Sequence, residues 1–196
     1  MFRTLRKLFH IIISLCRNFH YFYYPNRIKL LKRTIKCPET PRIHQFLLFT
    51  GQGSVSVGDN CTFGFKLGGF HRSGSIEIQA RYVKSIVRIG NNTSTNNNIF
   101  ICAANYVEIG NNVLIGNFVT ISDHDAHNTN PNKRNEIGAV GIVKIKNNVW
   151  IGNNVRISKN VEIGENSIIA SGSVVTKSFP ENVIIGGVPA KLIKSI

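Results

Sequence analysis

A six-residue period of hydrophobic positions organises the chain from about residue 50 onward. The clearest blocks read IGNNVL and IGNFVT, followed by IKNNVW, IGNNVR, ISKNVE, IGENSI and IASGSV. Their leading aliphatic residues keep a single phase: Ile109, Ile115, Ile121, Ile145, Ile151, Ile157, Ile163, Ile169 and Val175. Earlier blocks repeat more loosely, at Val57, Ile89 and Ile101. A period of six fits neither a helical heptad nor an alternating strand, so it predicts a parallel β-helix built from short strands and turns.

The residues inside each block indicate which positions face the core. We expect the leading aliphatic residue to point inward, and the Val or Ser four positions later to do the same. Gly, Asn and Asp occupy the corners, where tight turns need backbone conformations that these residues tolerate. The run VEIGNNV shifts the phase by two residues, which predicts an adjustment in the early coils. The expected fold class is therefore mainly β.

The repeat is broken once, between Ile121 and Val143, by the sequence SDHDAHNTNPNKRNEIGAVGI. A polar excursion of this length inside a tight solenoid is typical of a functional segment. Histidine has the intrinsic pKa that a general base needs near pH 7. The loop, residues 122–143, holds two histidines, two aspartates and a basic pair: His124, His127, Asp123, Asp125, Lys133 and Arg134.

The first 38 residues follow a different pattern, with apolar residues at helical spacing and basic residues between them. Residues 1–24 predict an amphipathic helix that ends at Pro25. Residues 26–38 predict a second short basic helix that ends before Pro38. We therefore divide the chain into a basic helical segment, 1–49, and a β-helix domain, 50–196, with a C-terminal tail at 180–196.

The positive charge of the chain is concentrated in this first segment. The sequence has 24 Lys and Arg against 10 Asp and Glu, a net charge of +14. Such a segment favours an anionic membrane surface, an acidic partner or nucleic acid; the competing interpretations are a solvated face or packing on a neighbouring subunit. Nucleic-acid binding is not expected, because no recognition motif accompanies the charge. Residues 1–38 hold no acidic residue and nine basic ones: Arg3, Arg6, Lys7, Arg17, Arg27, Lys29, Lys32, Arg33 and Lys36.

The sequence also predicts where the protein resides. No apolar run approaches the roughly 20 residues that span a bilayer. The N-terminal stretch has no small-residue cleavage site, so we expect it to be retained and not removed as a signal peptide. The expected location is cytoplasmic, with peripheral contact at the inner face of the cell membrane. Four widely spaced cysteines predict small hydrophobic residues in a reducing compartment: Cys16, Cys37, Cys61 and Cys102.

The second half of the chain resembles the hexapeptide-repeat acyltransferases over roughly residues 85–196. The stretch VWIGNNVRISKNVEIGENSIIASGSVVTKSFPENVIIGGVPAKLIKSI is most similar to the branch of sugar O-acetyltransferases, which includes galactoside, maltose, capsule and lipopolysaccharide acetyltransferases. Its ending, GSVVTK followed by a PxNV and a GxPAK motif, is more specific than the hexapeptides alone. The resemblance implies a left-handed parallel β-helix, a homotrimer and acetyl-CoA as the donor.

The resemblance also implies roles for particular residues. It places the general base at His127, with His124 as the second candidate. From their positions in the loop, we expect Asp123 or Asp125 to orient the imidazole or to cap the turn. The resemblance aims the backbone N–H of Asn153 at the thioester carbonyl. It assigns acetyl-CoA binding to Trp150, Gly152, Ser171, Thr176, Lys177, Lys191 and Lys194. It assigns acceptor binding to Asn98, Asp125, Lys133 and Arg134, and it implies no metal.

The resemblance implies an acetyl-CoA-dependent O-acetyltransferase that modifies a sugar hydroxyl in surface polysaccharide or lipopolysaccharide synthesis. The acceptor is expected to be a sugar, a nucleotide sugar or a lipid-linked oligosaccharide. Two other functions remain open at this point: an N-acetyltransferase acting on an amino sugar, and a non-catalytic β-helical scaffold that binds an anionic partner. A γ-class carbonic anhydrase is disfavoured, because no H-x4-H pair supplies the three converging histidines that its metal needs.

Overall fold

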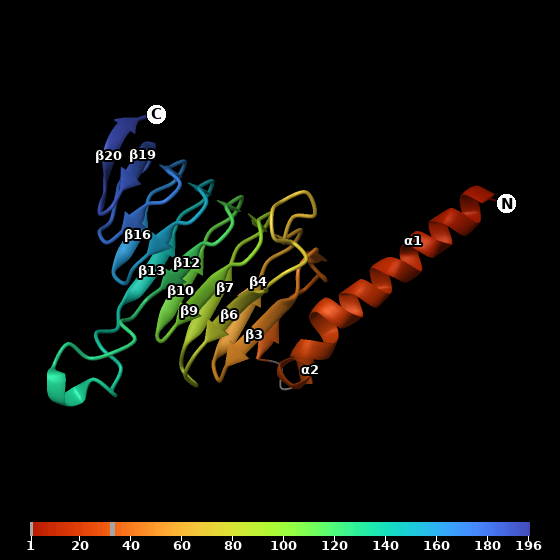
Figure 1. The fold of residues 1–196 in the computed structure, drawn as a ribbon, viewed down its shortest axis with the longest axis horizontal. Helices are drawn as coiled ribbons and strands as arrows, with labels where there is room; N and C mark the ends of the chain where they lie inside the picture. The colour runs from red at the N-terminus through yellow and green to blue at the C-terminus, as the bar shows by residue number, and fades with distance from the viewer. Residues whose placement is uncertain (1, 32–33) are drawn as a thin grey trace.

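The computed structural model describes residues 2–31 and 34–196, and it confirms the expected left-handed parallel β-helix. Short strands stack into three sheets that form the sides of a long prism, and the N-terminal helices lie at one end of it (Figure 1). Some side chains lie outside the described set, namely those of residues 2–7, 10, 28, 29 and 31. Six of the basic residues to which we assigned the positive charge of the N-terminal segment therefore lie outside the described residues or have undescribed side chains: Arg3, Arg6, Lys7, Lys29, Lys32 and Arg33.

Each coil contributes one strand to each of the three faces, which we call A, B and C in chain order. Face A contains β1 (Ile35–Lys36), β4 (Ser54–Val57), β7 (Ile86–Ile89), β10 (Tyr106–Ile109), β13 (Ile142–Ile145) and β16 (Val161–Ile163). Face B contains β2 (Arg42–Ile43), β5 (Thr62–Phe63), β8 (Ser94–Thr95), β11 (Leu114–Ile115), β14 (Trp150–Ile151), β17 (Ile168–Ile169), β19 (Val183–Gly187) and β20 (Ala190–Ser195). Face C contains β3 (Leu47–Gly51), β6 (Ile76–Ala80), β9 (Phe100–Ala103), β12 (Thr120–Ser122), β15 (Arg156–Ile157) and β18 (Val174–Val175). From β1 to β18 the chain passes from face A to face B, then across the B–C edge to face C, and then across the C–A edge to the next coil.

Stacked aliphatic side chains form the core, as the six-residue period predicts. On face A, Ile109, Ile145 and Ile163 lie in register on neighbouring strands and are buried. Val113 and Val149, four positions after a leading residue, are buried as well. Burial of successive aliphatic rows is the main force that holds the coils together.

Asparagine occupies many of the corners in the left-handed backbone conformation that its side chain tolerates. The corner amides also form ladders between coils; for example, Asn111 N–H donates to Asn147 Oδ1 over 2.9 Å. These bonds satisfy backbone donors that no strand partner reaches. The corner asparagines with positive φ are Asn60, Asn92, Asn98, Asn112, Asn148, Asn154, Asn160, Asn166 and Asn182.

The N-terminal segment differs from the prediction at Pro25, which does not end the helix. Helix α1 (Phe2–Asn18) continues through a π-helical turn, η1 (Phe19–Tyr23), into α2 (Tyr24–Leu31). In that turn Tyr24 N–H donates to Phe19 O, one residue further back than in an α-helix. The wider turn accommodates the proline, whose ring would crowd a carbonyl in a regular helix.

The β-helix also begins earlier than the expected boundary at residue 50. Strand β1 starts at Ile35, in the region where we predicted a second helix up to Pro38. Asn26, in the first turn of α2, attaches this helix to the first coil, because its buried amide donates to Leu47 O over 2.7 Å and accepts from Phe49 N–H over 2.7 Å. The first coils lack the six-residue signature, so the sequence pattern did not reveal them.

A second excursion, residues 64–75, interrupts the repeat between β5 and β6 at the B–C edge. The expectation of a single break was therefore wrong. The loop reads GFKLGGFHRSGS, and its glycines and polar residues lie where the period is already loose. Two buried amides hold it: Asn97 Nδ2 donates to Phe65 O (3.0 Å) and Gly69 O (2.9 Å), and Gln45 Nε2 donates to Phe70 O (3.1 Å).

The cysteines match their prediction only in part. Cys61 and Cys102 are buried, and burial raises the pKa of the Cys102 thiol to about 11. Cys37 is half-buried, and Cys16 is exposed on α1. All four are free thiols. None of the described helices has the length and hydropathy that a bilayer span requires.

Candidate functional site

The predicted catalytic loop leaves the prism at the C–A edge, between β12 and β13. The outgoing and returning halves of this loop run side by side in opposite directions. Asp125 N–H donates to Ala139 O over 3.0 Å, and Asn128 N–H donates to Glu136 O over 2.9 Å. A single 3-10 turn, η2 (Pro131–Lys133), closes the tip. The loop of residues 122–143 therefore projects from the β-helix with a defined conformation (Figure 1), and we call it the arm.

His127 is exposed on this arm and is oriented by one hydrogen bond. Its Nδ1 lies 2.7 Å from the carbonyl oxygen of Arg134. A carbonyl oxygen can only accept, so Nδ1 carries the proton and donates it. In that tautomer the lone pair lies on Nε2, which has no hydrogen-bond partner within the described residues. His127 therefore presents the free basic nitrogen that a general base requires.

His124 lies at the base of the arm in the opposite situation. Its side chain is 3% exposed, Nε2 lies 2.6 Å from an Arg81 guanidinium nitrogen, and Nδ1 lies 2.9 Å from Asp123 Oδ1. Because arginine can only donate, Nε2 must accept and Nδ1 must carry the proton. The lone pair of His124 is occupied, so the structure does not support its predicted role as an alternative base.

Asp123 has the capping role that the sequence left open between the two aspartates. Its carboxylate is fully buried and accepts backbone N–H bonds from Ala104 (2.7 Å), Asn105 (2.8 Å) and Tyr106 (2.7 Å). This corner is where the six-residue phase shifts by two residues, as the sequence predicted. Asp123 thus anchors both the corner and His124.

Asp125 joins the arm to the next coil by an ion pair. Its Oδ1 lies 2.6 Å from Lys159 Nζ. At the tip, Lys133 and Glu136 are exposed and 3.8 Å apart. Arg134 is exposed too, and it contributes its carbonyl to His127. Acceptor binding by Asp125, Lys133 and Arg134 stays a prediction.

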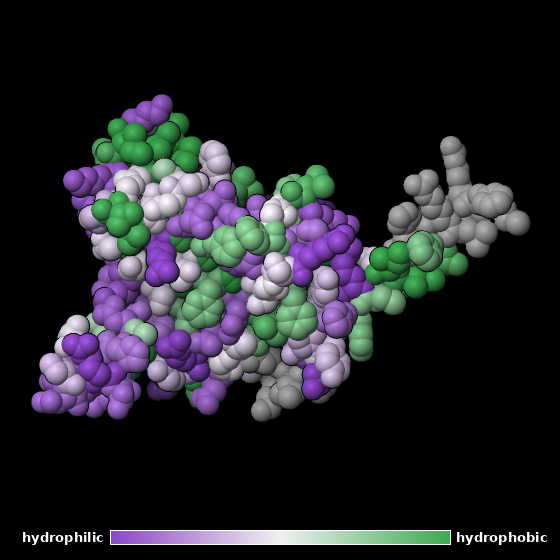
Figure 2. All heavy atoms as spheres, in the orientation of Figure 1, coloured by the Kyte–Doolittle hydropathy of each residue, from purple (hydrophilic) through white to green (hydrophobic). Residues whose placement is uncertain are grey.

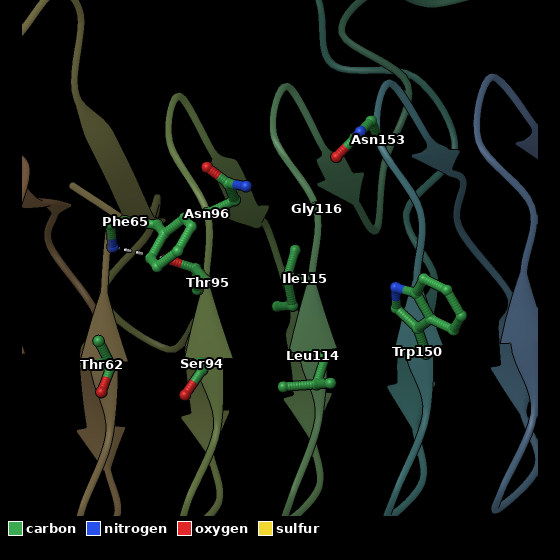
Figure 3. Close-up of a pocket in the computed structure, with 11 residues that line it drawn as sticks. Thr62, Phe65, Ser94, Thr95, Asn96, Leu114, Ile115, Gly116, Trp150 and Asn153 are labelled. Atoms are coloured by element: carbon green, nitrogen blue, oxygen red, sulfur yellow. Dashed lines mark hydrogen bonds between the residues drawn. The ribbon is translucent and has the colours of Figure 1, made fainter. Parts of the chain in front are cut away.

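Trp150 lies on the outside of face B and is 54% exposed. It stands in a row with Thr62, Ser94 and Leu114 on four neighbouring strands (Figure 3). Together with Phe65 and the adjoining corner residues, this row lines an open groove of about 350 Å³. An exposed tryptophan in a groove with few charges is suited to contact an apolar segment of a ligand.

The predicted oxyanion donor is not available in this structure. Asn153 N–H already donates to Ser171 Oγ over 3.0 Å, and Asn153 Oδ1 accepts from Asn117 N–H over 2.9 Å. The residue therefore belongs to the corner ladder. Gly152 has a packing role, because a Cβ there would lie 2.6 Å from the backbone nitrogen of Ser171.

The remaining predicted donor-binding residues lie in two separate places, on face B and at the C–A edge. Lys191 and Lys194 are exposed on β20, which extends the sheet of face B beyond Trp150. Thr176 and Lys177 follow β18 at the C–A edge, the same edge as the arm that carries His127. Lys177 lies over the Phe179 ring at 5.5 Å. The fold therefore does not gather the predicted acetyl-CoA residues into one pocket of a single chain.

Asn98 lies at the B–C edge and fulfils a corner role there, with φ of 58° and its N–H donating to Gln45 Oε1 over 2.7 Å. It also lines a second cavity, of about 420 Å³. The other lining residues of this cavity are Phe118, Thr120, Asn154 and Arg156. Within the described residues, no three His, Cys, Asp or Glu side chains gather into a metal-binding cluster.

Sequence reasoning missed several residues that shape these sites. Arg81, Gln45 and Asn97 carried no signal, because their partners are distant in sequence. Phe118 did carry one: the block IGNFVT has Phe at the corner where IGNNVL and IGNNVR have Asn.

Comparison with known proteins identifies the family of this chain. The family Bacterial transferase hexapeptide (six repeats) matches residues 142–177. A galactoside O-acetyltransferase from Escherichia coli (strain K12) is 44% identical over 114 residues, which cover 57% of this chain and 55% of the relative. A protein of the same strain named as a lipopolysaccharide biosynthesis O-acetyl transferase, WbbJ, is 31% identical over 151 residues, or 72% of each chain. The chain belongs to the hexapeptide-repeat transferase family.

The alignment with the galactoside O-acetyltransferase covers only part of this hexapeptide-repeat transferase and only part of the relative. The chain spans about half, 55%, of the length of the galactoside O-acetyltransferase. Among solved structures it is similar to the hexapeptide-repeat acetyltransferase VCA0836 from Vibrio cholerae O1 biovar eltor, complexed with acetyl coenzyme A. That match has 27% identity and a TM-score of 0.53 over 75% of this chain and 70% of the other.

Proposed function

We propose that this hexapeptide-repeat transferase moves an acetyl group from acetyl-CoA to a sugar hydroxyl, in the synthesis of a surface polysaccharide or lipopolysaccharide. The observation that carries the proposal is the arrangement at His127, an exposed imidazole whose Nδ1 proton is engaged and whose Nε2 lone pair is free. The names of the relatives, galactoside and lipopolysaccharide O-acetyltransferases, support the choice of group and acceptor class.

In the proposed reaction His127 acts as a general base and no acyl-enzyme forms. Nε2 accepts the proton of the sugar hydroxyl while the hydroxyl oxygen attacks the thioester carbon. Collapse of the tetrahedral intermediate breaks the C–S bond, and the imidazolium returns the proton to the CoA sulfur. The products are an acetyl ester and CoA. The Nδ1 bond to the Arg134 carbonyl keeps the ring oriented and favours the imidazolium while the proton is held.

Contacts to the donor are proposed on face B and at the C–A edge, where the predicted residues lie. Trp150 offers an apolar surface beside the pantetheine arm, and the lysines offer point charges for the phosphates. Gly152 and Ser171 line the adjoining corner. The proposed phosphate contacts are Lys177, Lys191 and Lys194, with Thr176 beside the first of them.

A second copy of the chain is needed to complete the proposed site. In a three-sided prism, the C–A edge that carries His127 lies opposite face B, which carries Trp150. The two side chains cannot meet within one chain, but the arm of one protomer can reach face B of the next. This geometry supports the proposed homotrimer, in which cyclic symmetry builds three equivalent sites.

Helix α1 supports the proposed peripheral contact with the inner face of an anionic membrane. Figure 1 shows it projecting away from the β-helix, and Figure 2 shows hydrophobic side chains on its visible face. A helix with exposed apolar residues among basic ones lies stably in the headgroup region of an anionic bilayer. We therefore favour a lipid-linked acceptor. The exposed apolar residues of this segment are Leu8, Phe9, Ile11, Ile12, Ile13, Leu15 and Phe19.

The membrane contact predicts sedimentation with vesicles of defined charge. The full chain is expected to bind phosphatidylglycerol vesicles and not phosphatidylcholine vesicles, and to release at high salt. Replacing Leu8, Ile12 and Leu15 together with serine should weaken binding about a hundredfold, because less apolar surface enters the bilayer. Leu192→Ser with Ile193→Ser, at exposed sites on β20, is the matched control. Equal binding by both variants would refute the contact.

The activity itself is tested by CoA release from acetyl-CoA with a panel of sugars, nucleotide sugars and lipid-linked oligosaccharides. Acceptor-dependent release, with the acetyl ester found on a sugar oxygen, is the expected result. Acetylation on nitrogen would instead assign the amino-sugar activity. Absence of both turnover and acetyl-CoA binding in calorimetry would overturn the proposal.

A further inference from the structure

Two phenylalanines adopt a backbone conformation that bulky side chains normally avoid. Phe70 has φ of 64° and Phe118 has φ of 55°. In the described part of the chain, the other non-glycine residues with positive φ are asparagines. Asparagine and glycine adopt this region at low cost, whereas an aromatic residue there is strained. Such strain is characteristic of functional positions.

Burial of the two rings does not explain the strain. Phe70 is 59% exposed and Phe118 is 41% exposed. They pack edge to face, with ring centroids 5.0 Å apart and planes at 70°. An aromatic pair left half in solvent stabilises the fold less than a buried pair would, while it presents a flat apolar surface.

The position of Phe70 is fixed by buried groups below the loop of residues 64–75. Gln45 is 1% exposed, and its amide donates to Phe70 O and to Ser73 O (3.0 Å). Asn97 is fully buried and accepts from Phe65 N–H over 3.0 Å in addition to its two donated bonds. A surface loop that buried amides hold in place is preorganised, so less conformational entropy is lost when a ligand binds to it.

Polar and cationic groups adjoin this aromatic surface. Phe118 lines the 420 Å³ cavity together with Asn98, Thr120, Asn154 and Arg156. Arg156 is exposed on face C, and within the described residues no carboxylate lies within ion-pair distance of it. Residues 64–75 add Lys66 and Arg72 and contain no acidic residue. In this cavity the Arg156 guanidinium can pair with a carboxylate of a ligand, and the neighbouring amide and hydroxyl side chains can form hydrogen bonds with its hydroxyl groups.

We propose that the Phe70–Phe118 pair and Arg156 form the binding site for an acidic saccharide, the acceptor of the transfer reaction. The apolar face of a pyranose ring lies on the aromatic pair, its carboxylate pairs with Arg156, and its hydroxyls face Asn154 and Thr120. This inference rests on the proposed function for the fate of the saccharide, but binding itself does not require turnover.

Replacing Phe118 with asparagine separates a binding role from a structural one. Phe118→Asn restores the residue used at the equivalent corners, so the melting temperature should stay the same or rise. The Kd for a uronic-acid disaccharide, measured by NMR titration of the full chain, should rise about tenfold as the aromatic contact is lost. Phe118→Gly, which also tolerates positive φ, should give the same loss. Val83→Asn, at an exposed apolar residue elsewhere, is the matched control and should change neither quantity.

Arg156 is tested with a matched pair of ligands, the uronic-acid disaccharide and its carboxyl-reduced neutral form. Arg156→Gln should raise the Kd of the acidic ligand about tenfold and leave the neutral one unchanged. Arg88→Gln, at an exposed arginine on face A, is the control. Equal affinity of wild type and both Phe118 variants, or equal effects of Arg156→Gln on the two ligands, would overturn the site. Saccharide binding without CoA release would retain this site and refute the transferase activity.

Discussion

Replacing His127 with alanine is expected to lower kcat for acetyl transfer by about three orders of magnitude, the loss typical of a removed general base. Nδ1 of this side chain is engaged by the Arg134 carbonyl, and Nε2 has no hydrogen-bond partner among the described residues. The KM for acetyl-CoA should change little, because the imidazole acts on the acceptor hydroxyl. CoA release followed with a thiol reagent, at saturating donor and acceptor, measures both constants.

His124 provides the matched control for that experiment. His124→Ala removes the acceptor of the Arg81 hydrogen bond and the donor to Asp123, so its main effect should be on stability. At temperatures where the variant remains folded, it should retain most of its turnover. An inactive but folded His124→Ala together with an active His127→Ala would reverse the assignment and contradict the tautomers inferred from the structure.

The second large effect is expected at Asp123. Asp123→Asn should lower the free energy of unfolding by about 3 kcal/mol or more. The asparagine keeps the shape of the side chain, but its NH₂ group faces a backbone N–H where a carboxylate oxygen now accepts from Asn105 and Tyr106. Two buried donors would then oppose each other at the corner. Urea denaturation followed by circular dichroism measures the loss.

Asp125→Asn is the control for this substitution. The Asp125 side chain is 39% exposed and its main partner is Lys159 at the surface of the next coil. Removing one charge of an exposed pair should cost less than about 1 kcal/mol. If both aspartate variants lose the same stability, the corner-capping role of Asp123 is incorrect.

Much of the architecture could be predicted because the period of six is a local property. It states, residue by residue, which side chains face the core, and the buried rows at Ile109, Ile145 and Ile163 match it. The arm at 122–143 could be located for the same reason, since it interrupts a regular signal. The start of the β-helix at Ile35 and the loop at 64–75 could not, because the early coils depart from the period. There the fold depends on contacts such as Asn26 with Leu47.

The sequence by itself placed two candidate histidines in one loop of a β-helical transferase, but it left these two histidines and two aspartates without assigned roles. Only the tertiary structure separated them. Arg81 lies 43 residues before His124 and occupies its lone pair, while Asp123 reaches a corner 17 to 19 residues away. Such neighbours in space decide which nitrogen of each histidine carries the proton and which groups each aspartate binds. A local pattern of hydrophobic and polar residues does not predict these neighbours. The same holds for Phe118, whose place in the repeat is visible in sequence but whose partner, Phe70, is brought to it by the fold.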